Sequence, residues 1–298
     1  MSNGLRAALL GLLLLPALTH AQSRIGADGG KLLLTAGFND VEGAGGGGLV
    51  PWALITGYGS NKSWGANAHI TDVRLREFDL RTFGVAAGFL DKLEISATRQ
   101  EFEVTGTALE GLEVSQDIVG IKLRVAGDAV YGQDRLLPQI ALGAQFKRNR
   151  GIENAGALVS PEQLGARQDK GVDVYVSGTK VLLASSFLVN VTLRYSSANQ
   201  LGLLGFGGDL ESGGKLNAEA TVGYLLTRKL AIGGEFRDRH NNLSVDDEGA
   251  GWDVFVAYAP NRNVSIVAAY VNLGNILGPA TTVDHDQTGS YLSVQVGF

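Results

Sequence analysis

The sequence has no cysteine, one methionine and 6 prolines, and it has no long apolar run after residue 21. Without cysteine the chain cannot form a disulfide, a thiolate metal site, a cysteine nucleophile or a lipid-modified N-terminal cysteine. Without a second stretch of about 20 apolar residues it offers no membrane-spanning helix. The formal net charge is −5 and the basic residues are dispersed, which argues against a nucleic-acid partner.

Glycine, in contrast, is abundant. The chain has 42 glycines among 298 residues, about twice the ordinary usage, and they follow no three-residue period, which excludes collagen. A hydrophobic fraction of 45% is too high for a disordered chain. The length alone allows one large domain or two small ones.

Residues 1–21 have the composition of a secretory signal peptide. Arg6 supplies a positive start, Ala7–Leu15 a short apolar core, and small residues precede a cleavage site before Gln22. The alternative is an N-terminal membrane anchor, which requires about 20 apolar residues, and Pro16 interrupts this run too early. The sequence therefore predicts an exported protein with one domain over 22–298.

Beyond residue 28, apolar side chains recur at every second position, which predicts β-strands. The segments 187–195, 216–224, 230–237 and 291–298 show the pattern most clearly. A soluble β-sandwich also alternates, with its apolar face in the core. The segments here are about 8–12 residues long, and strands that cross a membrane with a tilt need about 9–11.

Aromatic residues stand at the ends of the apolar faces, as Phe187 and Tyr195 do in one segment and Trp252 and Tyr258 in another. Aromatic girdles at both lipid–water boundaries are typical of outer-membrane barrels. Lipid offers no hydrogen-bond partner, so only a closed sheet satisfies every strand. The sequence thus predicts an all-β, transmembrane, antiparallel up-and-down β-barrel.

Fourteen candidate strands fit this pattern, and their connections alternate between short and long. The exceptions, 76–79 and 127–135, leave 12 or 16 strands open as alternatives. The candidate strands are 31–38, 50–58, 64–75, 80–90, 93–103, 117–126, 136–147, 172–182, 187–196, 215–226, 229–238, 251–259, 264–272 and 289–298.

Charged residues on the polar faces are predicted to line the lumen, because an arginine or lysine facing lipid at the midplane costs about 2–4 kcal/mol. Two interpretations remain open: these groups line a pore, or they pair across strands and fill the lumen. Small inward residues would leave room for a pore or for an inserted loop. The lumen-lining candidates are Lys122, Arg124, Asp173, Arg194, Glu219, Glu235, Arg237 and Asp253.

Two glycine-containing segments invite functional interpretations. Gly43–Gly48 is not a phosphate-binding loop, since Pro51 and a predicted strand follow where such a loop needs a helix; a flexible or inward-folding loop is expected. Leu201–Gly208 is too apolar for a solvated external loop. It either folds into the mouth of the barrel or packs between neighbouring loops.

Three histidines remain after the signal peptide. His69 alternates with polar neighbours and is expected to face the lumen, whereas His240 and His285 lie among carboxylates in the last two long loops. Such clusters could activate water or bridge divalent cations and lipopolysaccharide. Acidic solvated loops are the simplest interpretation. The sequence indicates no catalytic, cofactor-binding or metal site, and we expect no enzymatic activity.

Several blocks carry a resemblance to a known family. The segments 47–53, 128–147, 199–209 and 271–276 resemble recurring blocks of an uncharacterised family of Gram-negative exported, outer-membrane barrel-like proteins. The stretches 137–145, 173–180 and 190–194 are distantly similar to barrels associated with exopolysaccharide production. The first resemblance implies no activity, because its family has none established, and the second implies an envelope role.

We therefore predict a protein of the bacterial outer membrane that acts as a passive channel for a small or polymeric solute. The alternative is a structural or accessory envelope protein, involved in surface-polysaccharide export, with a plugged lumen; an embedded hydrolase ranks third. Expected partners are outer-membrane lipid and lipopolysaccharide, a second copy in a homo-oligomer, and the barrel-assembly machinery. The last would read the C-terminal strand, which ends in Phe298.

Overall fold

The computed structural model describes residues 31–107, 109–154 and 157–298, so the predicted signal peptide lies outside the described residues. Nearly all regular structure is β. The strands are β1 Trp64–Arg74, β2 Phe78–Phe89, β3 Leu93–Val104, β4 Glu113–Ala126, β5 Gln139–Asn154, β6 Ala157–Val159, β7 Lys170–Leu182, β8 Phe187–Ser196, β9 Lys215–Leu225, β10 Leu230–Arg237, β11 Gly251–Tyr258, β12 Val264–Asn272 and β13 Thr288–Gly297.

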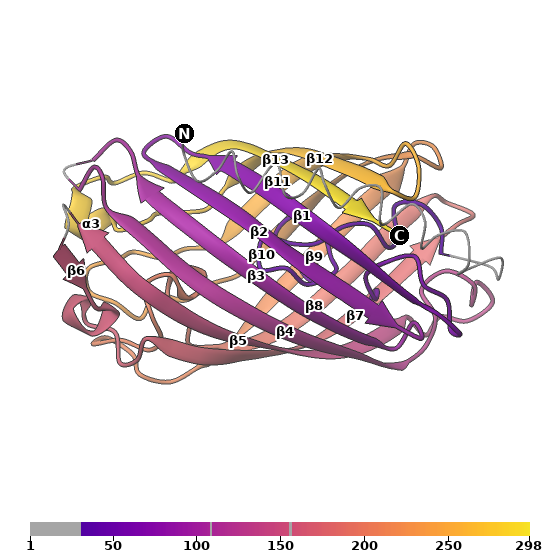
Figure 1. The fold of residues 1–298 in the computed structure, drawn as a ribbon, viewed down its shortest axis with the longest axis horizontal. Coiled ribbons are helices and arrows are strands. Elements are labelled where there is room, and N and C mark those ends of the chain that lie inside the picture. The colour runs from indigo at the N-terminus through magenta and orange to yellow at the C-terminus, as the bar shows by residue number, and fades with distance from the viewer. Residues whose placement is uncertain (1–30, 108, 155–156) are drawn as a thin grey trace.

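The strands close into a barrel (Figure 1). Neighbours in the chain pair antiparallel, β13 pairs with β1, and β5 pairs with both β4 and β7. Strand β6 extends the sheet only beside the far end of β5, where Ile152 faces Val159. The predicted closed, all-β barrel is confirmed, with 12 wall strands and one extra strand in the described part of the chain.

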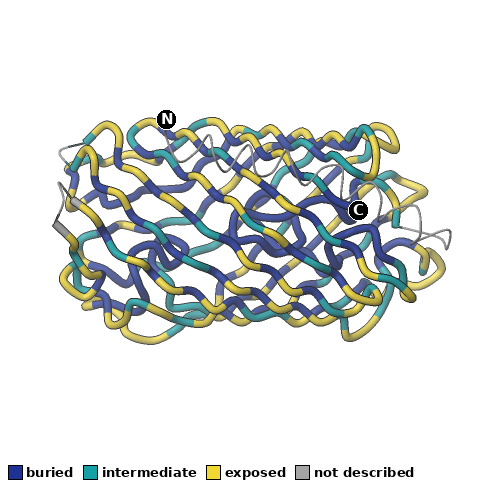
Figure 2. The backbone as a smooth tube through the Cα atoms, viewed as in Figure 1, coloured by how far each residue is buried: buried dark blue, intermediate teal, exposed yellow. Residues whose placement is uncertain are grey.

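Two of the fourteen predicted strands are wrong. Residues 31–38 and 50–58 do not join the sheet but lie inside the barrel, and Figure 2 shows this buried chain within the wall. We call residues 31–58 the plug segment. Within this segment the adjacent residues Val50, Trp52 and Ala53 are all buried, because a chain inside the lumen is surrounded by wall on every side. Pro51 also lacks the N–H that a central strand position needs.

Along each wall strand, buried and exposed residues alternate. In β8, Asn190 is 0% exposed and the adjacent Val191 is 53% exposed. The apolar side chains of the wall thus point away from the molecule and the polar ones point into it. This is the reverse of a soluble β-sandwich, so that alternative is wrong.

The connections define two ends of the barrel. At the turn end, β2–β3, β7–β8, β9–β10 and β11–β12 are joined over 90–92, 183–186, 226–229 and 259–263. The loop end carries 197–214, 238–250 and 273–287, together with the helical turns η1 Pro161–Leu164, η2 Gln200–Gly202 and α3 Gly278–Thr281. No helix in the described ranges is long and apolar enough to cross a membrane.

Candidate functional site

The outer surface is an apolar belt with unequal borders. On β8–β12 the loop-end border is aromatic, with Tyr195, Phe236, Trp252 and Tyr270 exposed. The rings of Trp252 and Tyr270 are 6.0 Å apart. At the turn end, Phe187 and Tyr224 pair at 5.1 Å and Trp64 and Phe298 at 4.9 Å. The aromatic residues therefore stand at the ends of the apolar faces on this side of the barrel.

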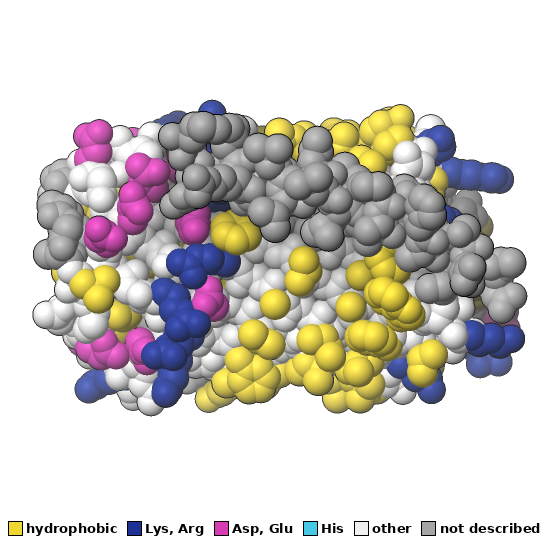
Figure 3. Space-filling view, in the orientation of Figure 1, with side chains coloured by type: hydrophobic (Ala, Val, Ile, Leu, Met, Phe, Trp, Pro, Cys, Tyr) yellow, Lys and Arg dark blue, Asp and Glu magenta, His cyan; other side chains and the backbone are white. Residues whose placement is uncertain are grey.

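On β1–β5 the loop-end border is charged instead, and Figure 3 shows a stripe of basic side chains beside the apolar belt. Arg99 lies 3.0 Å from Asp117, which also accepts a bond from Arg150 at 2.6 Å. Arg81 lies 3.3 Å from Asp72 on the neighbouring strand. The charges thus form two groups of cross-strand ion pairs at this border, one between β1 and β2 and one over β3, β4 and β5.

Inside the barrel, a cluster of charged groups holds the plug segment near the loop end. The carboxylate of Glu42 contacts Lys147 of β5, Arg194 of β8 at 3.3 Å and Arg237 of β10 at 2.8 Å. Two wall carboxylates complete the cluster, with Asp173 2.6 Å from Lys147 and Glu219 2.5 Å from Arg194. None of the five wall residues is more than 5% exposed.

Wall side chains also take the place of strand partners for the plug backbone. Glu94 accepts the N–H groups of Gly45 and Thr56, both at 2.8 Å, while Lys122 donates to the carbonyls of Gly45 at 2.7 Å and Trp52 at 3.1 Å. Glu235 accepts the N–H of Leu49 at 2.6 Å. An irregular chain away from water needs such partners, because each buried backbone group without one is costly.

The glycine run explains how the plug approaches the wall so closely. Gly43 has φ +90, a conformation that side chains with a Cβ rarely adopt. At Gly47 a Cβ would lie 1.9 Å from Glu235 Oε1. The structure has the inward-folding loop at Gly43–Gly48.

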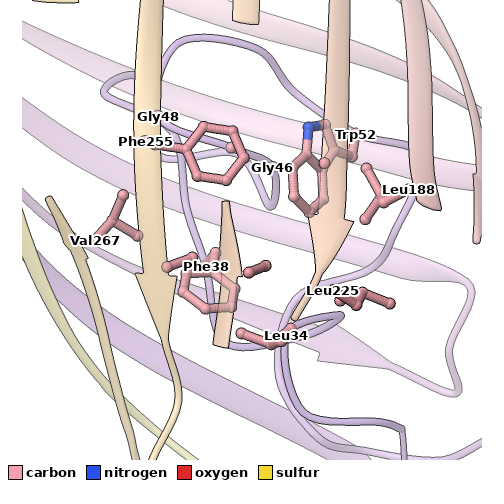
Figure 4. A pocket seen from close by; sticks show the side chains of 13 residues that line it. Leu34, Phe38, Gly46, Gly48, Trp52, Leu188, Leu225, Phe255 and Val267 are labelled. Carbon is pink, nitrogen blue, oxygen red and sulfur yellow. The ribbon is translucent and has the colours of Figure 1, made fainter. Parts of the chain in front are cut away.

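Near the turn end the plug contacts apolar wall. Leu34, Phe38 and Trp52 face a cavity whose other side chains come from β8–β12 (Figure 4). The cavity volume is about 30 Å³, room for only two or three waters, since each needs about 10–15 Å³. On the wall side the cavity is lined by Leu188, Gly223, Leu225, Ala231, Phe255, Ala257 and Val267.

The segment Leu201–Gly208 closes the mouth at the loop end. The carbonyl of Leu201 accepts bonds from Lys147 at 3.1 Å and from Gln116 at 3.2 Å, both wall residues facing the lumen. Phe206 pairs with Gln168 of a neighbouring loop. The two alternatives considered for this segment therefore occur together: it enters the mouth and packs between loops.

The long loops interlock above this segment. Glu248 accepts the N–H of Gln200 at 2.8 Å and lies 3.3 Å from Arg239. Asp246 accepts bonds from the side chain of Gln200 at 2.9 Å and the N–H of Leu277 at 2.6 Å. Burial raises the pKa of Glu248 to about 7, although Arg239 opposes the rise. Burial likewise raises the pKa of Asp246.

The structure places most of the predicted lumen residues around the plug. Arg124 differs, because it lies at the turn end, where it pairs with Asp91 and, at 3.0 Å, with Asp128. Asp253 is 2% exposed and neither of its carboxylate oxygens has a hydrogen-bond partner. The others are buried and bonded to the plug, to one another or to both: Lys122, Asp173, Arg194, Glu219, Glu235 and Arg237.

Sequence reasoning missed three charged members of this site. Lys147 and Glu94 lie on the lumen-facing sides of β5 and β3, two positions from Gln145 and Ser96 on the same faces, so the period of two carried the signal that could have found them. Glu42 lies in an irregular segment, where no periodicity marks an inward position.

His69 and His285 lie apart from the charged cluster, whereas His240 lines a small pocket together with Arg194 and Arg237. His69 is 5% exposed on the lumen side of β1, and neither ring nitrogen has a hydrogen-bond partner. His240 contacts Asn217 of β9, and His285 lies 3.2 Å from Glu77 between β1 and β2. Their loops adjoin through Asp246, but the two rings contact different elements. The described residues contain no group of three or more side chains suited to a metal.

Comparisons with solved structures return membrane barrels of low sequence identity. The KdgM porin matches with a TM-score of 0.48 and 10% identity, over 78% of this chain and 99% of that one. The NanC porin matches at 0.49 and 7%, over 78% and 98%. Omp33 of Acinetobacter baumannii matches at 0.44 and 9%, over 80% and 100%.

No curated protein matches the sequence. A family model does match, over residues 35–295, and its description is a protein of unknown function. The match covers most of the chain, and the resemblance noted from the sequence blocks is confirmed. This chain belongs to the DUF3034 family.

Proposed function

We propose that this protein is an outer-membrane β-barrel channel that its own plug segment closes, and that it conducts when the plug segment leaves the lumen. The observation that carries the proposal is the way the plug is held. Apart from the Tyr58 N–H, which donates to the carbonyl of Phe298 at 3.0 Å, the plug is bound by wall side chains such as Glu94 and Lys122, whereas the strands bond to one another around the whole circumference. Removing the plug would break no strand pairing.

The membrane location rests on the outer surface. Exposed apolar residues such as Ile121 and Val254, 45% and 60% exposed, would cost free energy in water. Aromatic rows at the belt borders suit a lipid–water boundary. A closed sheet leaves no strand edge for lipid to face. Outer-membrane lipid and lipopolysaccharide are then the partners of the belt, with the loop end facing outward as long loops do in such barrels.

The polar inner face of the wall favours a channel rather than a barrel with a permanently filled core. Once the plug segment is out, the inner surface would carry charges of both signs and the hydroxyl and amide groups of Thr221 and Gln145. Such a surface is stable in contact with water, so the emptied lumen would fill with water. An inner wall that serves only as a core is better built from apolar side chains, because buried ion pairs are weak contributors to stability.

A reversible lock on the plug tests this proposal. A Cβ at Gly37 of the plug would lie 2.6 Å from Ser265 Oγ of β12, within reach for a cysteine pair, and the chain has no other cysteine. In planar bilayers, the Gly37→Cys/Ser265→Cys protein should be silent when oxidised and should regain wild-type channel openings after reduction. The current through each single-cysteine variant should be the same under oxidising and reducing conditions. Equal current in both states would overturn the proposal.

A second candidate function is a structural or accessory envelope protein whose lumen stays filled. The specific observation in its favour is the second closure at the mouth, where Gln200 joins the loop groups Asp246 and Glu248. This candidate predicts silence in bilayers even for the reduced protein. It also predicts that a deletion strain loses surface polysaccharide while its uptake of small solutes is unchanged.

A further inference from the structure

Three basic side chains converge on one carboxylate deep inside the barrel. We propose that Lys147, Arg194 and Arg237 form a binding site for a solute that carries a carboxylate, and that Glu42 occupies this site as a built-in substitute while the plug is in place. We call these three residues the basic triad. The identification of the ligand as the transported solute rests on the proposed channel function, whereas the binding itself does not.

The contact geometry is that of a carboxylate receptor. One oxygen of Glu42 contacts Lys147, and the other lies 2.8 Å from Arg237 and 3.3 Å from Arg194. The three cations come from β5, β8 and β10, so the wall and not the plug determines their positions. Charge-assisted bonds of this kind are shorter and stronger than neutral ones.

The charge balance of the cluster favours an anion at this position. The basic triad supplies three positive charges, and the wall carboxylates in contact with it, Asp173 and Glu219, supply two negative ones. Glu42 brings the sum to zero. When the plug leaves and water enters, the wall keeps one positive charge without a counterpart at this point, and a cleft with charge of one sign attracts ligands of the opposite sign. An anionic solute restores the balance.

The site also has hydrogen-bond donors that Glu42 does not use. Arg194 Nη2 and Gln145 Nε2 are both buried and have no partner. Arg194 is 1% exposed and already donates through Nη1 to Gln145 Oε1 at 2.6 Å. A ligand with more acceptor atoms than one carboxylate could use these donors. The site therefore suits a small hydroxylated acid better than acetate or chloride.

Chemical rescue tests the binding without reference to transport. The variant Glu42→Ala leaves a space beside the basic triad in the full-length folded protein. We expect acetate to raise its thermal midpoint by roughly 2–4 °C, the shift that 1 kcal/mol of ligand binding gives in a chain of this size. Acetamide, and chloride at equal ionic strength, should have no such effect. A midpoint that acetate raises no more than chloride would overturn the proposal.

A matched control distinguishes the basic triad from any buried acid site. Glu248 is also a buried carboxylate but has one arginine partner, Arg239. Acetate should leave the thermal midpoint of Glu248→Ala unchanged. In the double variant Glu42→Ala/Arg237→Met the rescue should be lost, and rescue that survives there would contradict the assignment.

Bilayer recordings link the site to transport and cover the case in which Glu42→Ala does not fold. In the reduced Gly37→Cys/Ser265→Cys protein, gluconate should reduce the current, and sorbitol, its neutral counterpart, should not. Lys147→Met in the same background should lower the apparent affinity for gluconate about tenfold, which corresponds to about 1.4 kcal/mol. Openings that gluconate does not affect would overturn the inference and leave the channel proposal standing. Silence under reduction would overturn the channel proposal, and the rescue experiment would still decide the binding site.

Discussion

The plug segment is held in two different ways at its two ends. Toward the loop end, Glu42 forms ion pairs with the basic triad, and toward the turn end Leu34, Phe38 and Trp52 pack against apolar wall. We call these the charged contact and the apolar contact. Ion pairs require a particular partner in a particular position, whereas apolar packing only requires that area be removed from water. The charged contact thus determines the position of the plug in the lumen, and the apolar contact closes the lumen toward the turn end.

The largest effect is expected from breaking the charged contact. Arg194→Met leaves Glu42, Asp173 and Glu219 with one cation fewer in a buried cluster. Removal of one partner from a buried ion-pair network costs about 3–5 kcal/mol. We expect the folded, unheated gel species to be lost at a correspondingly lower urea concentration. The control Arg148→Met removes an exposed cation 3.6 Å from Asp169 and should cost about 0–1 kcal/mol; equal losses would contradict the comparison.

The mouth closure should depend on pH, although the apolar contact should not. In the folded state burial raises the pKa of Glu248 to about 7, above the ordinary glutamate value of 4.5. A carboxyl group with a raised pKa stabilises the folded state below pH 4.5, and that contribution is lost as the pH rises through about 7. At one pKa unit per 1.36 kcal/mol, the loss is about 3 kcal/mol.

Hydrogen exchange at the Gln200 N–H, which Glu248 accepts, is the direct measurement of this effect. After correction for intrinsic exchange, protection should be higher at pH 5 than at pH 8. Asp246 and Arg239 face the same group, so the control is Glu248→Gln, in which most of the pH dependence should disappear. A wild-type profile that stays flat across this range would contradict the prediction.

The apolar contact should lose less when one side chain is shortened. Leu34→Ala removes a side chain that is 3% exposed and faces the cavity near the turn end. Large-to-small changes of this type cost about 2–5 kcal/mol, and less where a site can collapse. The adjoining cavity gives the plug room to settle, so we expect about 2 kcal/mol. Leu32→Ala, at an exposed position of the same segment, is the matched control for urea unfolding.

The smallest effect is expected from the side-chain hydrogen bond of Trp52 within the apolar contact. The indole N–H of Trp52 donates to Thr221 Oγ1 at 3.0 Å. Trp52→Phe keeps most of the apolar surface and removes this bond, at a cost of about 1 kcal/mol. Urea unfolding, followed by the fluorescence of the remaining tryptophans, measures this loss of unfolding free energy. A loss as large as that of Arg194→Met would show that the seal, rather than the ion pairs, holds the plug in place.

Alternation identified the wall strands because each of them has two different environments. Segments such as 187–196 and 264–272 were predicted with the bounds that the structure has for β8 and β12. The same rule misassigned 31–38 and 50–58, which are rich in apolar residues but turn and bend inside the lumen, surrounded by wall. Alternation of apolar and polar residues indicates that a strand has two different faces. It gives no signal where the side chains on every side of a segment are buried.

The site was predictable in part for the same reason. Arg194 and Glu219 could be assigned to the inner face from their positions in alternating strands, but Glu42, which pairs with Arg194, could not. The pairing joins residues more than a hundred positions apart in the chain. Only the closed barrel brings β5, β8 and β10 around the same point.

The amino-acid sequence by itself determined the wall. Its period of two places apolar side chains on one face and polar or charged ones on the other, and a strand whose apolar face meets lipid must belong to a closed sheet. The tertiary structure alone decided what fills the barrel. Whether the charged inner face meets water, another strand or the chain's own N-terminal part depends on the space that closure leaves. That space is a property of strand number and tilt together, and no single segment encodes it.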